Sequence, residues 1–127
     1  MSPKNSGARR RTMFGTQFKQ GEVVLVPVPF TDLSGAKHRP ALIISNDDHN
    51  SKVEDVVICG ITSNIKDEDY SIIIDQKDMS EGAMPFLSRI KVDKLFTLNK
   101  KIVARRLGKV RREILESVKT EFAKLLG

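Results

Sequence analysis

Apolar residues occur along the chain in short clusters and then in one longer stripe near the C-terminus. The clusters are rich in Val, Ile and Leu and are separated by turn-forming residues, which is typical of strands. They predict strands at residues 22–28, 39–45, 55–61, 70–75, 88–92 and 102–104. Several short strands without alternating helices favour a mainly β fold, a small barrel of antiparallel strands, over a parallel βαβ sheet.

The stripe near the C-terminus recurs at helical spacing and predicts a terminal helix that packs on the barrel. Its members are Val110, Ile114, Val118, Phe122 and Leu125. Arg111 stands where Ser, Thr or Asp would be the preferred N-cap, so the sequence marks the start of this helix poorly.

The most apolar strand occupies residues 55–61, and its nearly continuous apolar run predicts a central, well-buried position. Cys59 is accordingly interpreted as a core residue. Gly60 would allow another group to approach the backbone closely. Pro27 and Pro29 indicate that the first strand ends at an edge or a departure point.

Alternation in residues 88–92 places Ile90 and Val92 on one face and Arg89 and Lys91 on the other. Two cations on one face of a strand would suit phosphate groups.

Polar segments connect the strands. Residues 30–37 form a predicted loop that could act as a lid beside the second strand. Residues 46–50 contain two aspartates and a histidine, but consecutive side chains rarely converge on one ion, so a polar turn is predicted instead of a metal site. Residues 77–82 are also predicted to form a turn.

Arg39 stands at the mouth of the second predicted strand. Pro40 is tolerated at a strand start and biases Arg39 toward an extended conformation. A guanidinium on a rigid base is well suited to bind phosphate. The alternative is an ordinary surface arginine at a strand end.

The net charge of +6 is concentrated at the N-terminus, because residues 1–20 carry +5 and the remaining residues only +1. Residues 1–17 are predicted to be a disordered basic arm, either in contact with the phosphates of a nucleic acid or non-essential. In the rest, residues 89–112 are mainly basic, and residues 47–81 are mainly acidic and are interpreted as solvated loop charges. A nearly neutral domain of this kind can bind nucleic acid through one local face.

Length and cysteine usage limit the class of protein. A chain of 127 residues predicts one domain, here residues 18–127. The single cysteine excludes an intrachain disulfide and indicates a reducing compartment. No apolar run approaches about 18 residues, so no membrane-spanning segment is predicted and a cytoplasmic location is expected.

Four segments resemble the MazF/PemK toxin family. They are GEVVLVPVPFTDL at residues 21–33, HRPALIIS at 38–45, GITS at 60–63 and SRIKVDKL at 88–95. The similarity runs from about Gly21 to the C-terminus, and its most specific parts are the Arg-Pro pair and the Ile-Thr-Ser segment. It implies a small SH3-like barrel, usually a homodimer, that cleaves single-stranded RNA without a metal or another cofactor.

The resemblance also implies site residues. Arg39 and Thr62 would be catalytic, with Arg39 stabilising charge on the phosphate and Thr62 holding the phosphate or the 2′-OH. The predicted RNA contacts are His38, Ser63, Ser88, Arg89 and Lys91. His38 could be the general base, but strand neighbours face opposite ways, so His38 would point away from a site that Arg39 faces.

The implied partners are single-stranded RNA and a cognate antitoxin with an acidic, disordered segment. The family's activity would make this chain a toxin that leaves 2′,3′-cyclic phosphate and 5′-hydroxyl ends on RNA. The alternative is a non-catalytic toxin on the same barrel that binds nucleic acid or gyrase, which would have no need of the Arg39 and Thr62 pair.

Overall fold

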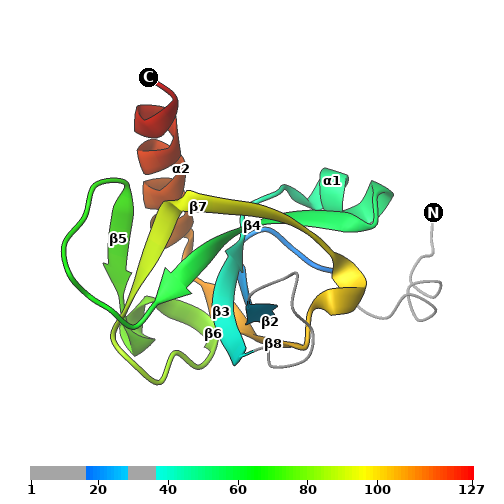
Figure 1. The fold of residues 1–127 in the computed structure, drawn as a ribbon, viewed down its shortest axis with the longest axis horizontal. Helices are drawn as coiled ribbons and strands as arrows, with labels where there is room; N and C mark the ends of the chain where they lie inside the picture. Colours follow the sequence, from blue (N-terminus) through cyan, green and yellow to red (C-terminus); the bar gives the residue numbers. More distant parts are fainter. Residues whose placement is uncertain (1–16, 29–36) are drawn as a thin grey trace.

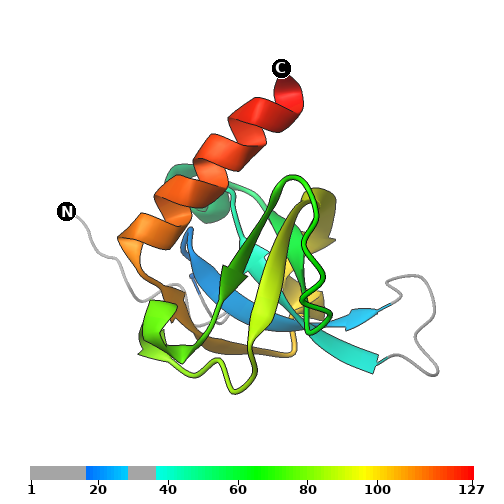
Figure 2. The same cartoon turned by 90° about the vertical axis from the view of Figure 1, so that its left-hand side faces the viewer.

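The computed structural model describes residues 17–28 and 37–127. Within them, seven antiparallel strands form one sheet in the order β5-β7-β4-β3-β2-β8-β6. The strands are β2 (Glu22–Val28), β3 (Lys37–Ile43), β4 (Asp55–Thr62), β5 (Ser71–Ile74), β6 (Met79–Gly82), β7 (Ser88–Asn99) and β8 (Arg105–Val110). The sheet curls into a half-barrel, and a C-terminal helix, α2 (Arg112–Leu126), packs against β5 and β7 (Figures 1 and 2). The predicted mainly β class with a C-terminal helix is confirmed.

Apolar side chains pack on both faces of the sheet, because successive residues of a strand point to opposite sides. One cluster contains Val23, Leu42, Cys59 and Ile90, and it is covered in part by apolar residues of α2. The other cluster contains Val24, Val26, Ala41, Ile43, Val56 and Ile58. The predicted central position of residues 55–61 is confirmed, since β4 lies between β3 and β7 and is largely buried.

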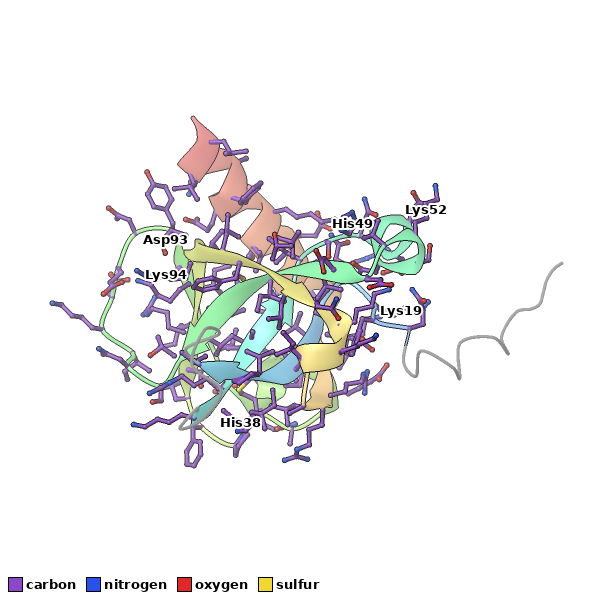
Figure 3. The ribbon with its side chains drawn as sticks, turned by 45° about the vertical axis from the view of Figure 1, so that its right-hand side comes forward. Lys19, His38, His49, Lys52, Asp93 and Lys94 are labelled. Atoms are coloured by element: carbon purple, nitrogen blue, oxygen red, sulfur yellow. The ribbon has the colours of Figure 1, made fainter. Side chains whose placement is uncertain are left out.

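Strand β7 is much longer than predicted, because it continues through a bend. Cys59 pairs with Leu95 and the next residue, Gly60, pairs with Lys91, so the register shifts between them. The extra residues of β7 at this shift include Asp93 and Lys94, both labelled in Figure 3. Their polar side chains hid the continuation of the strand in the sequence pattern.

The last predicted strand, at residues 102–104, was wrong. Lys100–Ile102 is a single 3-10 turn, and the strand is β8. The two arginines of β8 obscured this strand in the sequence pattern, but acidic side chains neutralise the charge of Arg106 in the fold. Its Nε lies 2.6 Å from Glu22 and its terminal nitrogen 2.5 Å from Glu81. These hydrogen bonds raise the pKa of Arg106.

Two predicted turns are regular structure. Residues 46–50 begin a short helix, α1 (Asp47–Lys52), because the Asn46 side chain accepts a hydrogen bond from the backbone N–H of His49. Residues 77–82 contain the end of a 3-10 turn (Gln76–Asp78) and then β6, which pairs with β8. The predicted basic arm, apart from Gln17, and the predicted loop at residues 30–37, apart from Lys37, lie outside the described residues.

The predictions for Pro27 and for α2 are confirmed, whereas Pro29 lies outside the described residues and β3 ends at Ile43 instead of residue 45. Strand β8 pairs with β2 only as far as Leu25, so Pro27 lies where β2 has β3 as its one strand neighbour in the described sheet. The N-cap of α2 is Arg111, which makes no side-chain capping hydrogen bond.

Candidate functional site

An open pocket of about 340 Å³ lies on the sheet face that carries Val26 and Ile58. Strands β2, β3, β4 and β7 contribute its walls, together with the segment that follows β4. The lining residues fall into an apolar group and a polar group. The apolar group is Val26, Val28, Pro40, Ala41, Ile58, Ile61 and Phe96, with Gly60 beside them. The polar group is Arg39, Thr62, Asn64, Glu68, Lys91 and Lys94.

Arg39 and Thr62 both line this pocket, as residues of neighbouring strands. The pairing of β3 with β4 ends at Ala41 and Gly60, and Arg39 and Thr62 each lie two residues beyond this last pair. Arg39 is exposed and has no ion-pair partner among the described residues. The Thr62 hydroxyl oxygen accepts a hydrogen bond from the backbone N–H of Asn64 at 3.1 Å, so its own proton can point into the pocket.

His38 lies beside Arg39 on β3 but does not line the pocket. It is exposed, and it pairs with Pro27 of β2. Figure 3 shows it at the outer end of β3. This agrees with the expected alternation along the strand, and the role of His38 as general base stays a prediction.

Lys91 lines the pocket but is already engaged. Its ammonium group forms an ion pair with Glu68, and Asp93 lies 4.0 Å away. The Lys91 side chain is only 13% exposed. Glu68 also lines the pocket, so a ligand that approaches the Lys91 ammonium also meets the Glu68 carboxylate.

Arg89 shares a face with Lys91, as predicted, but it is buried and does not line the pocket. It donates to the Ser71 hydroxyl at 3.1 Å and to the backbone carbonyl of Ile65 at 3.3 Å. Asp67 lies 3.4 Å from the same guanidinium, although its own side chain is 95% exposed. Arg89 thus anchors the segment between β4 and β5 to the sheet. The two cations do not form the free phosphate platform that the alternation indicated.

The two predicted serines lie apart from the pocket lining. Ser63 is exposed immediately after β4. Ser88 is buried, and its hydroxyl donates to the Phe86 carbonyl at 2.8 Å. Their predicted RNA contacts therefore have no support from the pocket geometry.

Sequence analysis missed four pocket residues, namely Asn64, Glu68, Lys94 and Phe96. Lys94 and Phe96 reach the pocket through the bend of β7, and Glu68 reaches it through the anchored segment. No local pattern signals either arrangement. Lys94, like Arg39, has no ion-pair partner among the residues that the structure describes. Within the described chain, the pocket therefore combines apolar residues with two cations that have no ion-pair partner, the Thr62 hydroxyl, the Asn64 side chain and a carboxylate paired with Lys91.

Cys59 lies in the core and not in the pocket, as predicted. Burial raises the pKa of its thiol to about 12, so it is not a nucleophile at neutral pH.

Two features typical of other functions are absent from the part of the chain that the structure describes. Residues 17–28 and 37–127 contain no group of three or more His, Cys, Asp or Glu side chains that could hold a metal ion. No helix within these residues is long and apolar enough to cross a membrane.

Solved structures show similar folds. An endoribonuclease in complex with its cognate antitoxin, from a mycobacterial species, has a TM-score of 0.71 at 24% identity, covering 87% of this chain and 95% of that one. MazF from Deinococcus radiodurans has a TM-score of 0.70 at 18% identity, covering 88% and 98%. The MazE-MazF complex from the same organism gives 0.71 at 21% identity, covering 88% and 98%.

Sequence comparison adds the family. Curated protein sequences give no match to this chain. A family model does match, and the matched residues 19–126 include every described strand and all of α2. The chain therefore belongs to the PemK-like, MazF-like toxins of type II toxin–antitoxin systems.

Proposed function

We propose that this toxin is an endoribonuclease that cleaves single-stranded RNA within the cytoplasm and needs no metal. The observation that carries the proposal is that Arg39 and Thr62 both line one open pocket, together with a group of apolar residues. Such a pocket can hold a base, while its rim holds the neighbouring phosphate. The similar structures described as endoribonucleases support the same activity.

The reaction is an internal transesterification. The ribose 2′-OH attacks the adjacent phosphorus, the bond to the 5′-oxygen breaks, and the products carry a 2′,3′-cyclic phosphate and a 5′-hydroxyl. The nucleophile is tethered next to the phosphorus, so the reaction can proceed without a metal-activated water. The 2′-OH loses a proton and the leaving oxygen gains one.

Arg39 stabilises the charge that develops on the phosphoryl oxygens, because its guanidinium can donate two parallel hydrogen bonds to a phosphate. It stays protonated at ordinary pH, so it cannot take the proton from the 2′-OH. Thr62 donates its hydroxyl to the phosphate or orients the 2′-OH. Lys94, the other cation of the pocket without an ion-pair partner in the described chain, adds positive charge near the substrate.

The cognate partner in this proposal is an antitoxin with an acidic, disordered segment that occupies the same pocket and its cationic rim. Two neighbouring structures are complexes with an antitoxin or with MazE. A homodimer would cover part of the apolar surface that this chain exposes. The exposed apolar residues are Val53, Ile65, Ile73, Phe86, Leu87, Leu95, Phe96, Ile102 and Leu126.

The test is cleavage of a mixed-sequence single-stranded RNA by purified protein, with and without EDTA. We expect equal cleavage in both, and a 2′,3′-cyclic phosphate at the new 3′ ends. Product ends are distinguished by their response to polynucleotide kinase and phosphatase. Strict dependence on magnesium would contradict the mechanism. Absence of cleavage by wild-type protein would favour a non-catalytic toxin.

A further inference from the structure

The charged groups of the pocket divide into two kinds. Arg39 and Lys94 are cations without ion-pair partners among the described residues. Lys91 and Glu68 form an ion pair with each other, and both residues line the same pocket. The first kind attracts an anion strongly. The second kind has almost no net charge but still offers a donor beside an acceptor.

A phosphate does not suit the Lys91 and Glu68 end of the pocket. The Lys91 side chain is 13% exposed and is compensated by Glu68, which is 43% exposed. A phosphate that approached Lys91 would meet the Glu68 carboxylate, and two anions repel strongly where water is partly excluded. The RNA backbone is therefore directed toward Arg39 and Lys94.

A nucleobase suits the remaining space. Its flat faces can lie against Val26, Ile58 and the ring of Phe96, which is 41% exposed. The volume of about 340 Å³ is that of a small-molecule site, for which about 300–1,000 Å³ is usual. The edge of the base then reaches the paired Lys91 and Glu68.

We propose that Glu68 is a specificity-determining residue, which accepts hydrogen bonds from an amino-bearing base and disfavours uracil. This proposal rests on the proposed function, because it uses the same pocket. Adenine, cytosine and guanine each carry an exocyclic amino group that donates to a carboxylate, beside an acceptor that can receive a hydrogen bond from Lys91. Uracil also has a donor beside an acceptor, but its ring N–H lies between two carbonyl oxygens. If Lys91 binds one of these oxygens, the other one is left against the Glu68 carboxylate, which repels it.

The variant that tests this is Glu68→Gln. Glutamine keeps the length of the side chain and an oxygen that accepts from Lys91, but it replaces the carboxylate with an amide that can donate to a uracil carbonyl. Asp67→Asn is the matched control, because it removes the same charge from the adjacent residue. Asp67 does not line the pocket, and its side chain is 95% exposed.

The experiment is cleavage of a randomised RNA pool, followed by sequencing of the bases around each cut. With wild-type protein, we expect one position where uracil is depleted. In Glu68→Gln, uracil should recover at that position by about fivefold or more, which is within the range of one good base contact. The other positions, and the whole profile of Asp67→Asn, should match wild type. Circular dichroism and the melting temperature verify that both variants are folded.

Three results would overturn the proposal and leave the proposed function intact. They are an unchanged profile in Glu68→Gln, an equal change in Asp67→Asn, and faster cleavage of all sequences alike. The last result would mean that Glu68 only repels the RNA backbone. If wild-type protein cleaves nothing, the proposed function fails, and base preference is measured by selecting the same pool on immobilised protein. Failure to enrich amino-bearing bases there would overturn this proposal as well.

Discussion

Thr62 pairs directly with Arg89 and lines the pocket together with Arg39, yet of the two arginines only Arg39 is exposed. Arg89 lies opposite Thr62 in the β4–β7 ladder, whereas the β3–β4 ladder ends at Ala41 and Gly60, two residues from Arg39 and Thr62 on their strands. The guanidinium of Arg89 is engaged by Ser71, Ile65 and Asp67. Arg39 has no such partner in the described chain, so the two arginines should respond very differently to mutation.

Replacement of Arg39 should impair the reaction and leave the fold intact. We expect Arg39→Ala to lower the cleavage rate by about 100-fold or more, as for loss of one donor to a developing anion. Its melting temperature should stay within about 2 °C of wild type, because an exposed side chain contributes little to stability. Arg39→Lys should recover little activity, since an ammonium lacks the planar pair of donors. Single-turnover kinetics and thermal unfolding measure the two effects, and wild-type cleavage by Arg39→Ala would remove it from the mechanism.

Replacement of Arg89 should give the opposite result. Arg89→Ala loses hydrogen bonds from a buried cation, which contribute about 1.5–3 kcal/mol each. The exposed Asp67 contributes little to this sum. We expect the free energy of unfolding of Arg89→Ala, measured by urea denaturation, to fall by at least the contribution of one such hydrogen bond. Loss of RNA binding with unchanged stability would instead support the predicted phosphate contact.

The sequence could predict residues that act through their own strand, but not residues that tertiary structure brings in. Thr62 ends β4 and Arg39 lies near the start of β3, both next to apolar runs that the pattern defines, and the family motif marks both. Glu68 enters the pocket because Arg89 anchors its segment, and Lys94 enters because β7 bends at a register shift. Neither event has a signature in the local sequence. Strand β8 was missed for a related reason, since its arginines find acidic partners on β2 and β6.

Cys59 should make the protein less stable at alkaline pH. Burial raises the pKa of the thiol from 9.0 to about 12, so the unfolded chain releases this proton at lower pH than the folded chain. Its contribution to stability is complete below pH 9 and is lost as the pH rises from 9 toward 12. Between pH 8 and 10.5 the loss should be about 2 kcal/mol. Urea unfolding of wild type and Cys59→Ala at both pH values isolates the contribution of the Cys59 thiol, because the other ionisable groups titrate equally in the two proteins. An identical decline in both would contradict the assignment.

The antitoxin should compete directly with RNA. Its acidic segment and the RNA backbone would both bind at Arg39 and Lys94, so one should displace the other. We expect a fluorescent, non-cleavable RNA to be released as antitoxin is titrated, and both affinities to fall with added salt. A saturating amount of antitoxin that leaves this RNA bound would show that inhibition occurs at another surface.

Gly60 offers a way to fill the pocket without harming the fold. It lines the pocket between Ala41 and Lys91, and a Cβ at this position would meet only Lys94, at an ordinary distance of 3.7 Å. Gly60→Ala should therefore keep or raise the free energy of unfolding by about 0.4–1 kcal/mol, because the unfolded chain loses freedom. Its methyl group would occupy space that the substrate needs, so we expect cleavage and RNA affinity to fall about tenfold. Gly108→Ala is the contrasting variant, since its Cβ would lie 2.3 Å from the Glu81 carbonyl and should destabilise the protein away from the pocket. Full activity in a stable Gly60→Ala protein would place the substrate elsewhere.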